Sequence, residues 1–514
     1  MSPLTQVLRN IFFGWAGYAA QIVITLLLTP LVLEKLGETQ YGLWTLLISI
    51  TGYYGLIDIG FRPGLIQYLS RSIGERDDTA LMRVASSGFF SLLGIGIVIL
   101  VVTCAVAYWL PSFVNLTDTS ARDVAICALF LGIGVAVQFP FLVFSSTLSA
   151  AERFDVANII GIVSRIAYAA LAYSALSFGG GILSLAIAMT VTNVADYVAR
   201  AVFAKRYVPA LAIRRKYIDR QTIKNFLGFG TWTSLGNASE RIASYSDMVI
   251  IGGMLSAAAI APYALATSMI SHFNRVVWPV ATVLFPAATK LDARGNISQL
   301  QTIYLTATRL ILGLALALAV VASYYAHPFF HIWLKNSATA ETIRVASHLI
   351  TFLTIPAVAV CWQMVGRQIM LARRHHQLLA MLLLPESVLN LILSLSLVQY
   401  LGVWGVALGT VISTSIFHLI VHPYFVARAI SLPASRIVRE TAVRPILLAT
   451  ATCIAFWSQA ILIPPPVTWL ELFAQATCSV MFVTVLFVLI VLYGSERKIF
   501  YPRLFRLLQL RPNL

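Results

Sequence analysis

Long apolar runs recur along almost the whole chain, and they decide which solvent it folds in. A helix needs about 20 consecutive apolar residues to cross the hydrocarbon core of a bilayer. Fourteen such runs can be read in these 514 residues, of which 59% are hydrophobic and only 11% charged. The backbone of each run can satisfy its hydrogen bonds in lipid by forming a helix. The sequence therefore predicts an all-α polytopic membrane protein with about 14 transmembrane helices.

The predicted spans form two groups of six and a final pair. The domains expected from them are an N-terminal six-helix bundle (1–204), a basic cytoplasmic linker (205–225), a C-terminal six-helix bundle (226–427), an extra helix pair (428–493) and a basic cytoplasmic tail (494–514). The spans lie near 11–33, 41–68, 84–110, 123–149, 156–178, 181–203, 226–252, 257–288, 303–327, 343–371, 377–400, 403–425, 445–463 and 468–493.

The basic residues indicate the orientation, because Lys and Arg are concentrated in cytoplasmic loops. If both termini are cytoplasmic, most of the 36 Lys and Arg residues fall in cytoplasmic segments. The opposite side then holds Lys35, Arg122, Lys335 and Arg344. The net charge of +16 is thus a topology signal that also favours anionic membrane lipids, and it does not indicate nucleic-acid binding.

The two groups of six spans agree in hydropathy when the chain is shifted by about 219 residues. This shift lays 36–44 on 255–263 and 70–77 on 289–296. Because six spans separate the copies, both start on the same side of the membrane, as in a parallel repeat about a pseudo-two-fold axis along the membrane normal. Two such bundles can rock around a central cavity.

Chemistry on a separate catalytic domain is not expected, because the loops are short and GxGxxG, P-loop and GxSxG motifs are absent from the sequence. The five cysteines never stand at CxxC spacing. His327 and His331 have an i, i+4 spacing, but a third ligand of the right type is lacking nearby. We therefore predict neither a metal site nor a cofactor.

Charges inside the spans are the informative residues, since each costs about 2.5–3.5 kcal/mol at a helix centre. Arg62, Arg165, Arg241 and Arg275 lie deep, near the midplane or in the cytoplasmic half. They predict a positively charged inward-facing cavity, and arginine is suited to fork-like bonding with phosphate oxygens.

Three further arginines lie closer to the cytoplasmic helix ends, namely Arg200, Arg309 and Arg367. We expect them to extend to the headgroups, and Arg200 to form a structural pair with Asp196.

Polar residues at helical spacing indicate which faces line the cavity. The seventh span carries a polar stripe, the eighth and second spans carry shorter ones, and Glu386 lies in the eleventh span. The stripes are Thr233, Asn237, Glu240, Ser244 and Asp247; Ser268, His272 and Arg275; and Tyr54, Asp58 and Arg62. Buried ion pairs that only fix helix packing, such as Asp58 with Arg62, are the alternative interpretation.

The stretch 14–70, GWAGYAAQIVITLLLTPLVLEKLGETQYGLWTLLISITGYYGLIDIGFRPGLIQYLS, carries LG, YG, W and DIG landmarks. With the layout of the spans, it resembles the polysaccharide-repeat-unit (O-antigen type) flippases of the multidrug/oligosaccharidyl-lipid/polysaccharide exporter superfamily. The resemblance implies transport of an undecaprenyl-diphosphate-linked oligosaccharide to the outer leaflet of the bacterial cytoplasmic membrane. It also implies that cavity cations hold the diphosphate, and helix by helix these match Arg62, Arg241 and Arg275.

The resemblance further implies alternating access without enzymatic activity. Gly60, Pro63 and Gly64 are hinge candidates in the second span, or the cause of a plain kink. Multidrug members commonly carry an acidic coupling residue on the first span, which is lacking here, so drug export is less expected. Coupling to a proton gradient, a sodium gradient or the membrane potential stays open. The carboxylates available for it are Asp58, Glu240, Asp247 and Glu386.

Two alternatives remain from the sequence. One is a lipid II or multidrug exporter of the same superfamily. The other is a membrane polysaccharide polymerase or ligase, although such enzymes usually present a large external loop. Expected partners are the lipid-linked oligosaccharide, membrane lipids, and polymerase and chain-length proteins.

Overall fold

The structure is a computed structural model that describes residues 3–57, 61–114, 120–229, 231–282, 284–373, 375–493 and 496. Within these ranges the chain is helical and contains no β-strand. Eleven helices in the same ranges are long and apolar enough to cross a membrane. The predicted class, an all-α polytopic membrane protein, is confirmed, while the arrangement of fourteen spans in two bundles stays a prediction.

The chain divides into two compact units, and the boundary falls inside helix α9 (Ala257–Thr282). Unit 1 comprises Met1–Ala264 with the short segment Asn336–Ala338. Unit 2 comprises Leu265–Lys335 and Thr339–Leu514. Unit 1 therefore continues past the basic segment 205–225 that the sequence predicts as a linker.

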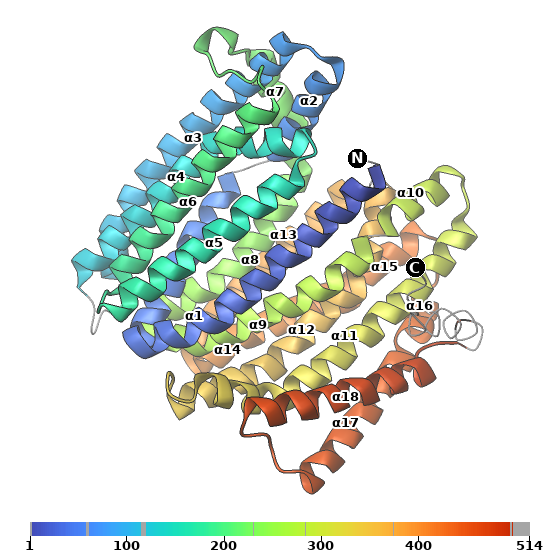
Figure 1. Ribbon diagram of the computed structural model, residues 1–514. Helices are drawn as coiled ribbons and strands as arrows, with labels where there is room; N and C mark the ends of the chain where they lie inside the picture. The colour runs from blue at the N-terminus through green and yellow to red at the C-terminus, as the bar shows by residue number, and fades with distance from the viewer. Residues whose placement is uncertain are drawn as a thin grey trace, which may run out of the picture. The chain divides into compact units, whose positions relative to one another are not determined.

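Unit 1 is built from long helices joined by short connections (Figure 1). Its elements are α1 (Pro3–Tyr53), the 3₁₀ turn η1 (Tyr54–Ile57), α2 (Phe61–Glu75), α3 (Asp78–Phe113), α4 (Ala121–Ala150), α5 (Phe154–Ser177), α6 (Ile182–Tyr207), the 3₁₀ turn η2 (Arg215–Tyr217), α7 (Arg220–Phe229), α8 (Thr231–Met254) and the start of α9.

The first two predicted spans form one kinked element. Gly37 interrupts α1 with φ 78° and ψ 171°, a backbone conformation that glycine adopts without the strain of a side chain. The kink lies between the predicted spans 11–33 and 41–68. The sequence therefore located the end of the first span correctly.

The second predicted span differs from the expectation of one continuous helix. Its α-helical part ends at Tyr53, η1 follows, and α2 begins at Phe61. Tyr54 is buried and its hydroxyl accepts a hydrogen bond from Thr103 on α3, whereas Arg62 is exposed. The prediction that Tyr54 and Arg62 share one face is therefore wrong, because the helical spacing does not continue between them. Asp58 and Gly60 lie outside the described residues.

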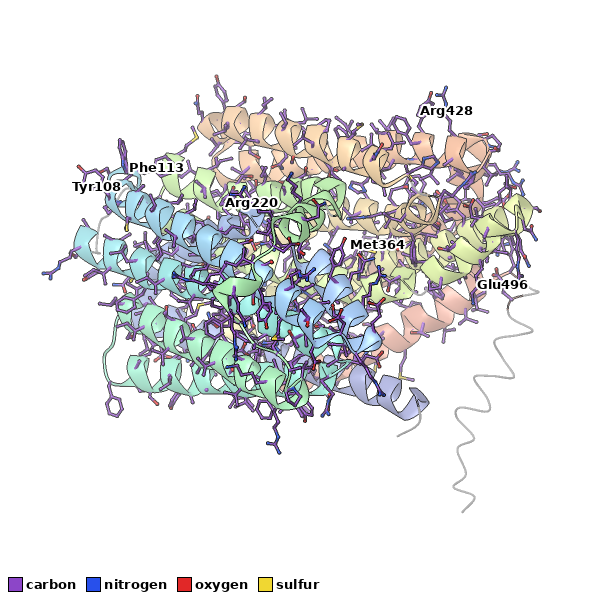
Figure 2. All side chains as sticks on the ribbon, turned by 90° about the horizontal axis from the view of Figure 1, so that it is seen from above. Tyr108, Phe113, Arg220, Met364, Arg428 and Glu496 are labelled. Carbon is purple, nitrogen blue, oxygen red and sulfur yellow. The ribbon has the colours of Figure 1, made fainter. Side chains whose placement is uncertain are left out.

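Small residues let α3 and α4 pack closely in the core of unit 1. A Cβ atom added at Gly96 would lie 2.6 Å from the backbone oxygen of Ala136, so only glycine fits there. Leu65, Leu92 and Val143 are fully buried in the same core. The end of α3 is different: Tyr108 and Phe113 are exposed (Figure 2). Exposed aromatic rings are typical of the membrane interface.

The basic segment 205–225 is ordered against α3 rather than a free linker. The hydroxyl of Ser86 accepts a 3.0 Å hydrogen bond from the backbone N–H of Arg214. The hydroxyl of Ser87 accepts one of 2.9 Å from the backbone N–H of Asp219, the residue that precedes α7. Two consecutive serines on α3 thus hold the start of α7 in place.

Unit 2 contains the remainder of α9 and the following helices (Figure 1). These are α10 (Leu284–Ala293), α11 (Ile297–Leu334), α12 (Ala340–Ala372), α13 (His376–Leu401), α14 (Val403–Ile416), the π-helical turn η3 (Phe417–Val421), α15 (His422–Ala429), α16 (Ala434–Thr441), α17 (Val443–Leu462) and α18 (Trp469–Ile490). The last two coincide with the predicted spans 445–463 and 468–493, while their role as an extra pair outside two bundles stays a prediction.

Arg309 on α11 anchors the residues that follow α18. Its side chain is only 2% exposed and forms an ion pair with Glu496 (Figure 2 labels this residue). Its guanidinium also lies 3.9 Å from the ring centroid of Tyr493, and Arg444 lies at the same distance from that ring. The prediction that Arg309 extends to the headgroups is therefore wrong, because a carboxylate far along the chain neutralises it inside the protein.

Candidate functional site

Three of the four predicted cavity arginines belong to unit 1. Arg165 lies in the middle of α5, Arg241 in the middle of α8, and Arg62 is the second residue of α2. Arg62 and Arg165 are exposed and Arg241 is half-buried. Charges at the centre of a membrane helix need a polar surrounding, so these positions predict a polar compartment beside α5 and α8.

The backbone of α1 provides the contacts of two of these guanidinium groups. Arg241 Nη1 donates a 3.2 Å hydrogen bond to the carbonyl oxygen of Gly52. Arg165 Nη1 donates one of 3.3 Å to the carbonyl oxygen of Gly17. Gly55, in the turn after α1, leaves the space for Arg241: a Cβ atom there would lie 2.2 Å from Arg241 Nη1.

These guanidinium groups differ from the paired arginines elsewhere in the chain. Arg200 lies 2.5 Å from Asp196, as predicted for a structural pair. Among the described residues, by contrast, no carboxylate oxygen lies within 4.0 Å of a guanidinium nitrogen of Arg62, Arg165 or Arg241. Their positive charge is therefore not neutralised by a carboxylate of the described residues.

The fourth predicted cation, Arg275, belongs to unit 2. It is exposed near the C-terminal part of α9, and His272 on the same helix is half-buried. The grouping of all four arginines around one ligand stays a prediction.

The predicted carboxylates have different surroundings. Asp247 is buried and accepts a 2.5 Å hydrogen bond from the hydroxyl of Tyr263, within unit 1. Asp247 therefore takes part in helix packing, and its place on a cavity-lining stripe stays a prediction. In unit 2, Glu386 lies on α13 with one carboxylate oxygen 3.4 Å from Nε2 of His418.

The remaining predicted positions are described only in part. The side chains of Asn237, Glu240 and Ser244 lie outside the described residues, as do Asp58 and Gly60. Pro63 and Gly64 lie in the first turn of α2, where a proline's missing N–H would have no helical partner. A hinge at these residues stays a prediction.

Sequence reasoning missed the surroundings of Glu386. His418 and His422 flank it from the helix that follows α13, and both are buried. The i, i+4 spacing of the two histidines was the available signal. It could not reveal the third group, because Glu386 comes from a separate helix.

Eleven helices of the described ranges that are long and apolar enough to cross a membrane define a polytopic membrane protein, and the proteins to which the chain is similar are transporters rather than enzymes. The polysaccharide biosynthesis protein family matches residues 7–292, and this chain belongs to that family. The resemblance that the N-terminal landmarks indicate is thereby confirmed.

Two relatives and one solved structure are similar to this chain. The chain is 21% identical to the uncharacterized membrane protein EpsK of Bacillus subtilis over 428 residues, 82% of this chain and 83% of EpsK. It is 20% identical to a putative O-antigen transporter of Shigella flexneri over 290 residues, 56% of this chain and 67% of the relative. The structure titled lipid II flippase MurJ, inward closed conformation, has a TM-score of 0.72 and 14% identity, covering 96% of this chain and all of that chain. The last comparison shows a shared fold.

Proposed function

We propose that this protein is a flippase that moves an undecaprenyl-diphosphate-linked oligosaccharide repeat unit from the cytoplasmic to the outer leaflet of the bacterial cytoplasmic membrane. The product would serve surface polysaccharide synthesis, such as O-antigen, capsule or exopolysaccharide. Both termini would be cytoplasmic. Polysaccharide polymerase and chain-length proteins would take over the flipped unit.

One observation carries the proposal: Arg165 and Arg241 lie at mid-helix, and the described chain gives them no carboxylate partner. A diphosphate suits guanidinium groups, because phosphate oxygens match the planar donors of arginine. The family match and the putative O-antigen transporter among the relatives support a lipid-linked sugar as the cargo.

The mechanism we propose is alternating access. Arg62, Arg165, Arg241 and Arg275 would bind the diphosphate from the cytoplasmic side, while the polyprenyl tail stays in lipid. Rocking of the two helix bundles would then expose the headgroup outward. A proton gradient, a sodium gradient or the membrane potential would drive the cycle, with Asp58, Glu240, Asp247 and Glu386 as the carboxylates that could couple to an ion.

A deletion strain of the source bacterium tests the proposal. Loss of the protein should leave the lipid-linked repeat unit in the cytoplasmic leaflet and abolish surface polysaccharide. Arg241→Ala and Arg275→Ala should fail to restore it. Arg71→Ala should restore it, because Arg71 is an exposed arginine already paired with Glu75 at 2.9 Å. Full rescue by Arg241→Ala at equal protein level would contradict the proposal.

Three further assays distinguish the alternative functions. A lipid II exporter would instead rescue a cell that lacks its lipid II flippase, and a multidrug exporter would change drug resistance without affecting polysaccharide. A polymerase or ligase would join repeat units as the purified protein alone.

A further inference from the structure

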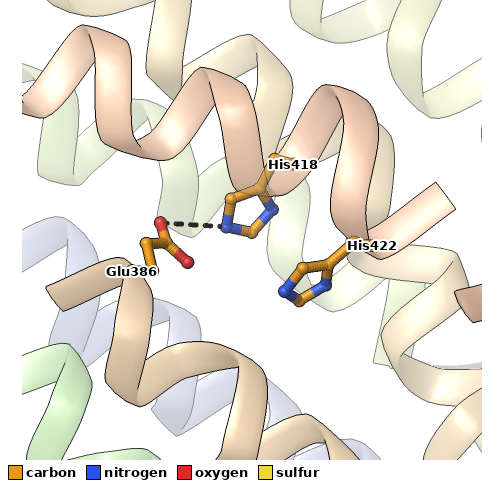
Figure 3. A group of neighbouring side chains, drawn as sticks. All are labelled: Glu386, His418 and His422. Atoms are coloured by element: carbon orange, nitrogen blue, oxygen red, sulfur yellow. Dashed lines mark ion pairs between the residues drawn. The ribbon is translucent and has the colours of Figure 1, made fainter. Parts of the chain in front are cut away.

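Three side chains that can bind a metal converge in unit 2. Glu386 extends from α13, and His418 and His422 extend from the helical stretch that runs from α14 through η3 into α15 (Figure 3). Nε2 of His418 lies 3.4 Å from Oε1 of Glu386, and the two imidazole rings stack with centroids 4.7 Å apart. One ligand atom from each of the three lies within 4.8 Å of the other two.

The helix that carries the histidines is widened between them. Residues Phe417–Val421 form a π-helical turn, in which the N–H of His422 donates to the carbonyl oxygen of Phe417. Pro423 follows directly and lacks the N–H that a regular α-helical turn would use. Single π-helical turns inside α-helices are frequent at functional sites. Here the turn sets the direction of both imidazole rings.

Several polar atoms of this cluster are buried without a partner. His422 is 2% and His418 8% exposed. Nε2 of His422, Nδ1 of His418 and Oε2 of Glu386 have no hydrogen-bond partner within the part of the chain that the structure describes, and neither amide atom of Gln363 has one. Burying such groups unpaired is unfavourable, so a ligand that contacts them would relieve this cost.

The adjoining cavity limits the size of that ligand. It has a volume of about 20 Å³ and is lined by both histidines together with Gln363, Arg367, Trp278 and Met364. This is room for about one water-sized particle. A single ion fits, whereas a sugar or a diphosphate does not.

A fixed cation lies beside the cavity. Arg367 lines it and lies over the ring of Trp278, 5.6 Å from the centroid. Neutral imidazole is the form of histidine that binds a metal. The carboxylate of Glu386 offsets part of the repulsion between Arg367 and a bound cation.

We propose that Glu386, His418 and His422 bind a divalent transition-metal ion of the Zn²⁺ class. Imidazole nitrogen suits Zn²⁺, Ni²⁺ and Cu²⁺, whereas Mg²⁺ prefers oxygen ligands alone. Ligands at about 2.0–2.1 Å in tetrahedral geometry are about 3.3–3.4 Å apart. The Glu386–His418 pair already has this spacing, and a side-chain rotation of His422 would bring its ligand atom, which lies within 4.8 Å of the other two, closer to them. The amide oxygen of Gln363 or a water would complete the shell.

The ion would tie α13 to the π-helical turn and so hold the second half of unit 2 together. This role is separate from the proposed transport of a lipid-linked sugar. It assigns Glu386 to metal binding rather than to ion coupling.

Metal titration tests the proposal. The full-length protein is purified in detergent without a histidine tag and is stripped of metal with a chelator. Zn²⁺ alone should bind at one equivalent and raise Tm, and Co²⁺ alone should give the intense visible absorption of tetrahedral coordination. Each of Glu386→Gln, His418→Ala and His422→Ala should weaken Zn²⁺ binding by about 100-fold. The Co²⁺ spectrum needs only the unaltered chain, so it tests the site even if a variant fails to fold.

The chain offers a matched control in its other i, i+4 histidine pair. His327 and His331 also stack, with centroids 6.1 Å apart, and the described residues provide no carboxylate to complete a metal site with them. His327→Ala with His331→Ala should leave Zn²⁺ binding unchanged. The proposal is overturned if Zn²⁺ does not bind stoichiometrically, if the control variant loses binding, or if excess Na⁺ or Mg²⁺ displaces the ion.

Discussion

Arg241 on α8 donates a 3.2 Å hydrogen bond to the carbonyl oxygen of Gly52, near the C-terminal end of α1. The contact binds one guanidinium nitrogen and leaves the charge without a carboxylate in the described chain. Glycine at position 55 makes this approach possible, and a prediction follows from that space.

Gly55→Ala should impair transport through Arg241. The added Cβ atom would lie 2.2 Å from Arg241 Nη1, so the guanidinium must move. We expect surface polysaccharide in the complemented deletion strain to fall to about the level given by Arg241→Ala, with the Tm of the purified variant little changed. Gly74→Ala is the control, because nothing lies within 4 Å of a Cβ atom there. Normal polysaccharide with Gly55→Ala would show that the position of Arg241 is unimportant.

The buried ion pair of Arg309 and Glu496 should matter for stability. Removing one partner leaves the other charge uncompensated, which destabilises by about 3–5 kcal/mol for a buried pair. Glu496→Gln leaves the Arg309 guanidinium, which is only 2% exposed, without its carboxylate and should therefore lower Tm markedly in detergent. Arg344→Ala breaks an exposed pair, in which both side chains are 62% exposed, and should cost less than about 1 kcal/mol. Equal Tm values for the two variants would argue against a buried ion pair.

Asp219 should make the start of α7 sensitive to acid. The carboxylate of Asp219 accepts a 2.6 Å hydrogen bond from the Thr222 hydroxyl and a 2.8 Å hydrogen bond from the Thr222 backbone N–H. These bonds hold the pKa of Asp219 below its ordinary value of 3.8. Because the folded pKa is lowered, the stabilisation is complete above the ordinary pKa and is lost as pH falls through the lowered value. Hydrogen exchange of the α7 amides, after correction for intrinsic rates, should be constant from about pH 7 to 5 and should become faster as pH falls below the ordinary Asp pKa of 3.8. Asp219→Ala should exchange faster throughout this range.

Ser86 and Ser87 should protect the basic segment from proteolysis. Their hydroxyls accept the backbone N–H groups of Arg214 and Asp219. In the double variant Ser86→Ala, Ser87→Ala, limited trypsin digestion should cut within 205–219 several-fold faster. Ser458→Ala is a suitable control, since that exposed hydroxyl bonds only within its own helix. Unchanged cleavage would mean that other contacts hold the segment.

Run length predicted most helix positions, but not how far the helices extend. The span predicted at 303–327 is the centre of α11 (Ile297–Leu334), and the span at 343–371 is the centre of α12 (Ala340–Ala372). The additional N-terminal turns, 297–302 and 340–342, are more polar, because the helices continue beyond the apolar layer where hydropathy no longer marks them. Caps mark the ends instead: Asn296 and Thr339 accept backbone N–H groups at the two N-termini.

Candidate site residues could be selected where the sequence pattern that marks them lies within one helix. Arg165 and Arg241 stand out as charges in apolar surroundings, and the Asp196–Arg200 pair follows from i, i+4 spacing. The pairing of Arg309 could not be predicted in this way, because its partner Glu496 is 187 residues further along the chain. Periodicity reports the faces of single helices, whereas pairing between helices depends on packing that a single sequence does not encode in any local pattern.

The π-helical turn at Phe417–Val421 also acts on everything downstream of it. Such a turn is equivalent to one residue inserted into an α-helix, and one residue corresponds to about 100° of rotation. The face of α15 that is buried, which includes Val426 and Ala427, is therefore set by this change of helical phase. Deletion of a single residue from the turn would leave a regular helix that presents the wrong face to its neighbours.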